Sequence, residues 1–196
     1  MAVDNLRITP TKLNTMKKYI LITGLMLLTL NVLHAQLYFT TTGFAGFYSK
    51  TPFEDIKAEN NQVYAVIDPS KKSIAFSMLL NGFVFTKELM QEHFNENYIE
   101  SDKYPKATFT GAYADGPLPR KDGVYKVLVK GRLSLHNISR DIEVPATLEM
   151  TGGRLKGEAE FRLKPEDFNI RIPSLVRDKI SAEMTVKVRI DCGAAK

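Results

Sequence analysis

The chain has 196 residues, of which 44% are hydrophobic and 25% are charged, and this composition excludes a disordered protein. Its formal net charge is +5, but the first 35 residues hold four of the 27 basic and one of the 22 acidic side chains, so the rest carries +2. The remaining basic residues are scattered along the chain, and the sequence therefore predicts no nucleic-acid partner.

The first 35 residues have the organisation of an export signal. A basic pair at 17–18 precedes an apolar run over 19–33, and the small residue Ala35 follows, which are the three parts of a secretory signal peptide. The run is shorter than the ~20 residues of a membrane-spanning helix. We therefore expect translation to start at Met16 after an upstream extension, and cleavage after Ala35. The mature chain, one domain over 36–196, is then periplasmic or secreted and has no stable membrane span.

From residue 36 onward, apolar and polar residues alternate with a period of two, which is typical of half-buried β-strands. In chain order, we expect strands near 44–49, 62–67, 73–80, 107–113, 125–135, 142–150, 154–163 and 182–190. One segment breaks this period. Thr86 can cap a helix that runs to about Tyr98, because Leu89, Met90 and Phe94 follow at helical spacing.

The connections between these segments contain turn-forming residues. Gly152-Gly153 separates two alternating runs as the two-residue turn of a tight hairpin does. Asn60-Asn61 and 68–70 also read as turns, and 115–123 reads as a longer loop. Gly131 lies inside a strand pattern, where glycine can mark a bend that helps a barrel to close. About eight antiparallel strands can form a sandwich or a barrel, and the pattern alone leaves both open.

Residues that could support catalysis or bind a metal are few. His93 and His136 are far apart in the sequence and lack carboxylates at metal-motif spacing, so we expect structural roles for both. The pair 166–167 is expected to enter a turn. The one cysteine, Cys192, cannot form an internal disulfide or a cysteine zinc site. We expect an incidental free thiol near a frayed terminus, with a disulfide-linked homodimer as the alternative. The sequence thus predicts no enzyme, no catalytic residue, no metal and no cofactor.

Five segments occur in the order found in a known family. They are 93–99, 104–109, 131–140, 164–170 and 178–180. The first two are similar to a helix followed by a Tyr-Pro-x-x-x-Phe strand entry, and the third to a central hairpin. The fourth resembles an Asp-Phe-Gly-Ile segment, and the fifth leads into the last strand.

Through these segments, the chain over about 38–191 resembles the YceI-like family of periplasmic proteins. Asn137 and Asn169 stand where that family often has glycine, and both turns can survive because asparagine tolerates left-handed backbone. The family's Arg-Asp and Asn-Arg pairs are replaced by Gln91-Glu92 and Lys164-Pro165. The chain is therefore identified as a divergent member.

The resemblance implies an all-β fold, an antiparallel and extended lipocalin-like β-barrel of about eight strands with one short helix between strands. It also implies an exported binding protein whose apolar barrel cavity holds an amphiphilic lipid or polyisoprenoid, for carriage or sequestration. Ten large apolar residues are the candidate cavity lining: Phe76, Met78, Phe83, Phe85, Phe94, Phe109, Leu133, Phe161, Phe168 and Met184.

Two other functions stay open. One is an envelope stress-response or interaction module whose barrel is filled by its own side chains and holds no ligand. A cavity of several hundred Å³ would favour the binding protein, because ligand pockets run to ~300–1,000 Å³. The other is a hydrolase or isomerase, which a turnover that depends on His93 would support.

Overall fold

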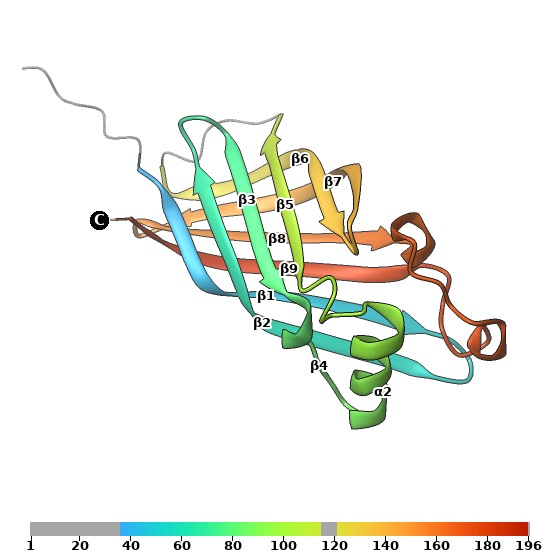
Figure 1. The fold of residues 1–196 in the computed structure, drawn as a ribbon. Helices are drawn as coiled ribbons and strands as arrows, with labels where there is room; N and C mark the ends of the chain where they lie inside the picture. The colour runs from blue at the N-terminus through green and yellow to red at the C-terminus, as the bar shows by residue number, and fades with distance from the viewer. Residues whose placement is uncertain (1–35, 115–120, 196) are drawn as a thin grey trace, which may run out of the picture. The chain divides into compact units, whose positions relative to one another are not determined.

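The computed structural model describes residues 36–114 and 121–195 (Figure 1). The expected upstream extension, start at Met16 and signal peptide lie outside the described residues, as does most of the expected loop at 115–123. None of the helices in these two ranges is long and apolar enough to cross a membrane.

Eight antiparallel strands form a closed barrel, so the predicted fold class is confirmed and the sandwich is excluded. Around the barrel the order is β1-β9-β8-β7-β6-β5-β3-β2, and β2 pairs again with β1. The strands are β1 (Tyr38–Lys50), β2 (Asp55–Asp68), β3 (Ser73–Leu79), β5 (Lys106–Tyr113), β6 (Gly123–Leu135), β7 (Ile138–Thr151), β8 (Arg154–Leu163) and β9 (Met184–Ala194). A ninth strand of two residues, β4 (Val84–Phe85), pairs with the first half of β2 and is not one of the eight barrel strands.

Alternation along each strand sends one set of side chains into the barrel. On β9, Met184, Val186, Val188 and Ile190 line the interior, as the sequence pattern predicts. The predicted strand was to begin at Ala182, but β9 begins at Met184 and continues to Ala194.

The tight turns have the left-handed backbone that their residues favour. Gly152 and Gly153, with φ of +56° and +75°, join β7 to β8 as a two-residue turn, which confirms that prediction. His136 and Asn137, with φ of +51° and +60°, join β6 to β7 in the same way. Asn169 follows a short helix with φ of +56°. Both asparagines that replace a family glycine therefore keep the turn.

The predicted turn at Asn60-Asn61 is wrong, because both residues lie within β2. They fall where the pairing of β2 with β1 shifts register, so the extra polar residues form a bulge and the chain does not reverse. The Asn60 side chain is buried there. Its Nδ2 donates to the carbonyl oxygen of Leu79 at 2.8 Å, and its Oδ1 accepts from the backbone N–H of Gln62 at 2.8 Å.

In residues 36–114 and 121–195 one α-helix lies between strands, and it begins later than predicted. The helix α2 (Glu88–His93) continues into a π-helical turn, η2 (Phe94–Tyr98). Lys87 precedes its first residue, and no side chain caps it, so the predicted cap at Thr86 is wrong. Three short 3₁₀ helices complete the described chain: η1 (Leu80–Gly82), η3 (Pro165–Phe168) and η4 (Ser174–Val176). The pair Glu166-Asp167 lies in η3, at the turn where the sequence placed it.

The end of the barrel where β1 begins and β9 ends is filled by a packed core. Its buried members are Tyr38, Ala65, Ile67, Ile74, Tyr113, Val127, Leu148, Met150, Leu155, Ile190 and Cys192. Cys192 is fully buried in this cluster, so the expectation of a thiol at a frayed terminus is wrong. We call this the closed end of the barrel.

Candidate functional site: an apolar cavity in the barrel

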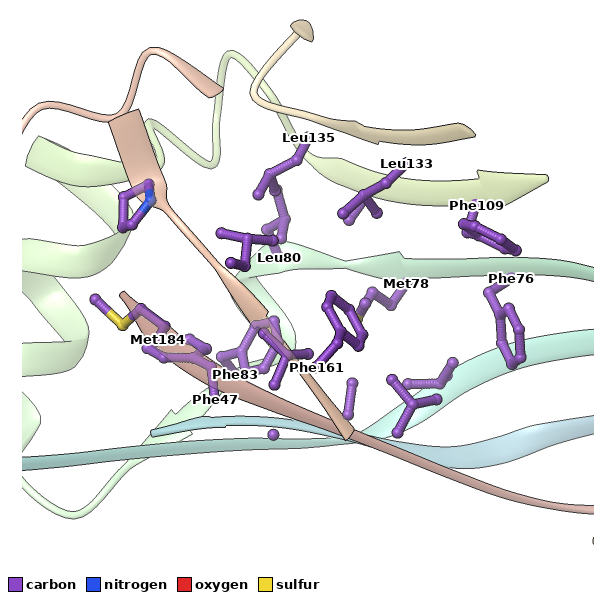
Figure 2. A pocket seen from close by; sticks show the side chains of 18 of the residues that line it. Phe47, Phe76, Met78, Leu80, Phe83, Phe109, Leu133, Leu135, Phe161 and Met184 are labelled. Carbon is purple, nitrogen blue, oxygen red and sulfur yellow. The ribbon is translucent and has the colours of Figure 1, made fainter. Parts of the chain in front are cut away.

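A cavity of about 360 Å³ lies inside the barrel, and all eight barrel strands contribute to its wall. Figure 2 shows Phe76, Phe109 and Leu133 on one part of this wall and Phe47, Phe83 and Met184 on another. Ile67, Ile74, Leu148 and Ile190 belong both to the wall and to the closed-end core, and therefore form the floor. The volume is within the ~300–1,000 Å³ of ligand pockets.

Nine of the ten residues predicted as lining lie on the cavity wall. They are Phe76, Met78, Phe83, Phe85, Phe94, Phe109, Leu133, Phe161 and Met184. The exception is Phe168, which is buried in a core cluster beside the cavity with Leu80, Ile99 and Ile170. That these residues contact a ligand stays a prediction.

Four phenylalanines gather at the end of the cavity nearest α2. The ring of Phe94 lies 5.4 Å from that of Phe47, 5.9 Å from that of Phe83 and 5.1 Å from that of Phe85, measured between centroids. Tilted and edge-on aromatic pairs at such distances stabilise each other beyond simple burial. Because Phe94 belongs to η2, this cluster anchors the helical segment to the barrel wall.

Phe47 was missed by the sequence analysis, although its strand was predicted. It alternates on β1 with Ala45, which also lines the cavity, and this period is the signal that could have identified it. Further wall residues come from the segment after β8: Ile170, Ile172, Val176 and Ile180. That segment has no strand or helix period, so no sequence signal placed these four.

Among the described residues of the wall, five are polar: Glu54, His93, Tyr98, Glu158 and Lys179. Glu158 lies on β8 and is exposed. His93 and Lys179 are also exposed, so the cavity reaches the surface between α2 and the segment after η4. We call this the open end. Burial raises the pKa of the Tyr98 phenol, which therefore stays neutral at the wall.

The other histidine, His136, has a structural role. His136 Nδ1 donates to the carbonyl oxygen of Phe168 at 3.0 Å, and its Nε2 lies 3.2 Å from Oε2 of Glu100. The ring of Tyr104 packs edge-on against it, at 4.3 Å between centroids. His136 thus ties the β6–β7 turn to η3 and to the end of η2. In residues 36–114 and 121–195, no group of His, Cys, Asp and Glu side chains could hold a metal ion.

Comparison with known proteins agrees with this architecture. The sequence model of the YceI-like domain matches residues 28–192. A polyisoprenoid binding domain from Saccharophagus degradans, implicated in plant cell wall breakdown, superposes with a TM-score of 0.67 at 17% identity, over 81% of this chain and 98% of that one.

Two further solved structures are similar. The protein BcnA from Burkholderia cenocepacia has a TM-score of 0.63 and 18% identity, over 79% of this chain and 96% of that one. A YceI protein from Campylobacter jejuni has 0.56 and 16%, over 71% and 84%. At these identities the likeness shows a shared fold. No curated protein matches the chain.

Proposed function

The chain belongs to the YceI-like domain family, and we propose that it is an exported binding protein. It holds an amphiphilic lipid or polyisoprenoid, for carriage or sequestration. The observation that carries the proposal is the apolar cavity of about 360 Å³ inside a closed barrel. The proposal includes no catalytic step, metal or cofactor, and it places the mature protein in the periplasm or outside the cell.

The shape of the cavity favours a chain-like ligand. On β9 alone, the wall runs from Ile190 at the floor to Met184 near the open end. The six steps from Met184 to Ile190 cover about 20 Å, at ~3.3 Å per residue. A cavity of this volume that extends so far is narrow, and an extended hydrocarbon chain fits it better than a compact ligand.

The wall also favours an apolar tail. Each CH₂ group moved from water into such a site gains about 0.8 kcal/mol. Of the polar wall residues, Glu54, His93 and Lys179 lie on the segments around the open end. An amphiphile therefore enters with its tail towards the floor and keeps its polar head at the open end.

A barrel filled by its own side chains is disfavoured as the alternative. The large wall residues leave a continuous cavity because small ones stand among them, including Ala146, Gly157 and Ala159. An interaction module without a ligand would have no use for this volume. The polyisoprenoid binding named for the Saccharophagus degradans domain supports the choice of ligand class.

A chain-length series tests the proposal. Since the chain has no tryptophan, we would follow the fluorescence of bound cis-parinaric acid and its displacement by geraniol, farnesol and geranylgeraniol. If the tail fills the cavity, the affinity rises at least about tenfold with each added isoprene unit. This increase is smaller than the one expected if each of the unit's carbons gained the full ~0.8 kcal/mol. Equal affinity for all three alcohols, or no binding of the probe, would overturn the proposal.

A further inference from the structure

Four of the five most exposed large apolar side chains of the described residues lie around the open end of the barrel. The described residues include nine large apolar side chains that are exposed, and the most exposed is Leu175 on η4, at 92%. Phe53 is exposed to 72%, Val84 to 65% and Leu89 to 62%, and all three lie at the same end as Leu175. Val124, which is exposed to 67%, is the exception, because it lies on β6 at the closed end.

These four residues belong to three segments that meet around the cavity opening. The segments are the β1–β2 turn, β4 with α2, and residues 171–183, and each contributes residues to the wall. Lys87 joins the second to the first through an ion pair with Glu54, at 2.7 Å between Nζ and Oε1. The backbone N–H of Ser181 donates to Oγ of Ser49 at 2.8 Å and joins the third to the first. Figure 1 shows all three at the same end of the barrel.

The charge around Leu175 indicates what this surface contacts. Residues 171–183 hold Arg171, Arg177 and Lys179 against Asp178 and Glu183, a formal net charge of +1. Glu183 is paired with Arg162 and Lys164 outside the segment, which leaves the segment an unpaired charge of +2. Since Glu88 and Glu92 flank Leu89 on α2, the basic part of this surface is the segment around Leu175. Among the ion pairs of the described residues, none includes Arg171, Arg177 or Lys179. An apolar tip between unpaired cations is the composition that binds the interface of anionic lipid membranes.

We propose that the open end docks on an anionic lipid bilayer, with Leu175 and Phe53 entering the interface and Arg171, Arg177 and Lys179 contacting the head groups. The inference rests on the proposed function and adds the route by which the ligand reaches its site. Val176 and Ile180 of the docking segment line the cavity, so docking places the opening against the bilayer. A lipid then moves between bilayer and cavity without exposing its tail to water.

Co-sedimentation with vesicles tests the docking. The wild-type protein binds vesicles of phosphatidylglycerol and phosphatidylcholine, and binds pure phosphatidylcholine at least about tenfold more weakly, because the cations lose their partners. Leu175→Ser lowers the bound fraction at least about fivefold, since it removes the side chain that enters the interface. Val124→Ser is the matched control at the closed end and leaves binding unchanged. Thermal unfolding confirms that both variants fold.

The docking is overturned if the wild type binds neither vesicle, binds both equally, or loses as much binding through Val124→Ser. It is also overturned if sedimentation velocity shows a self-associated protein that Leu175→Ser makes monomeric, because the surface then joins two copies of this chain. The binding of cis-parinaric acid in solution without vesicles distinguishes the docking proposal from the proposed cavity function. Probe binding without vesicle binding removes only the docking, and vesicle binding without probe binding removes the cavity function and the transfer route with it.

Discussion

The ring of Phe109 on β5 lies against the backbone of Gly131 on β6. A Cβ atom added to Gly131 would come within 2.6 Å of Cζ of Phe109 and within 2.6 Å of Cα of Gly111, its partner across the two strands. Paired glycines therefore let β5 and β6 approach closely and let the Phe109 ring lie along the cavity wall. The sequence predicted a bend at Gly131, and what the structure shows there is this close approach.

Replacing this glycine should distort the wall. Gly131→Ala is expected to lower the free energy of unfolding by about 1–3 kcal/mol, because the new methyl group meets backbone atoms that cannot turn aside. Urea unfolding measures the loss. Gly193→Ala on β9 is the control, since a Cβ there meets only the Arg154 side chain at 3.8 Å. Equal stability of the two variants would contradict this reading of Gly131.

Filling the cavity should block binding while the barrel stays folded. Ala159 on β8 lines the wall, and Ala159→Phe would occupy part of the cavity volume. We expect the affinity for cis-parinaric acid to fall at least tenfold, or about 1.4 kcal/mol. Ala75→Phe adds the same bulk at an exposed position of β3 and should leave affinity unchanged. If the two variants bind the probe equally well, the probe is not in this cavity.

The turn between β2 and β3 depends on the Asp68 carboxylate. Its Oδ1 accepts hydrogen bonds from the Ser70 hydroxyl and from the backbone N–H groups of Ser70 and Lys71, at 2.9 Å and 3.2 Å for the two amides. The Ser70 hydroxyl is the largest cause that lowers the pKa of Asp68 below its ordinary 3.8, and the amides and the Lys71 charge add to it. Asp68→Ala should therefore cost about 1–3 kcal/mol of unfolding free energy at neutral pH.

The same carboxylate gives a signed pH dependence. Because its pKa is lowered on folding, its stabilisation is fully present above the ordinary pKa and is lost as the pH falls through the lower folded value. Asp68→Asn keeps an acceptor oxygen but cannot titrate. In urea unfolding, the advantage of wild type over Asp68→Asn should shrink in acid, and an advantage that grows in acid would contradict the assignment.

The Cys192 thiol should be inert in the folded protein. Burial raises its pKa to about 12, so at neutral pH it is neither a thiolate nor accessible. We expect a thiol reagent such as 5,5′-dithiobis(2-nitrobenzoic acid) to label it only after denaturation. Rapid labelling of the folded protein, or a disulfide-linked dimer that retains the native fold, would show that the closed end opens.

The strands could be predicted because one face of each packs inside the barrel and the other meets solvent. Inward positions of β8 and β9, such as Phe161 and Met184, follow directly from that period. Asn60 misled the prediction because its burial in a bulge depends on a bond to Leu79, nineteen residues away. Cys192 misled it because nearness to a terminus says nothing of tertiary packing.

The cavity itself could be predicted only as a property of the family. Its volume depends on how eight inward faces fit together, including small residues such as Gly157 that no local pattern assigns to a wall. The open end depends on residues 171–183, which have no period and are positioned by distant contacts such as that of Ser181 with Ser49. Rules based on the period of neighbouring residues do not predict contacts between residues so far apart in the sequence.

Native mass spectrometry after incubation with geranylgeraniol tests the central claim most directly. The apolar cavity predicts a complex of one lipid with one protein, which survives transfer to the gas phase in the wild type and is largely lost in Ala159→Phe. Repeated recovery of the unliganded mass alone, from a wild-type protein shown to be folded, would contradict the account of this barrel as a lipid-binding protein.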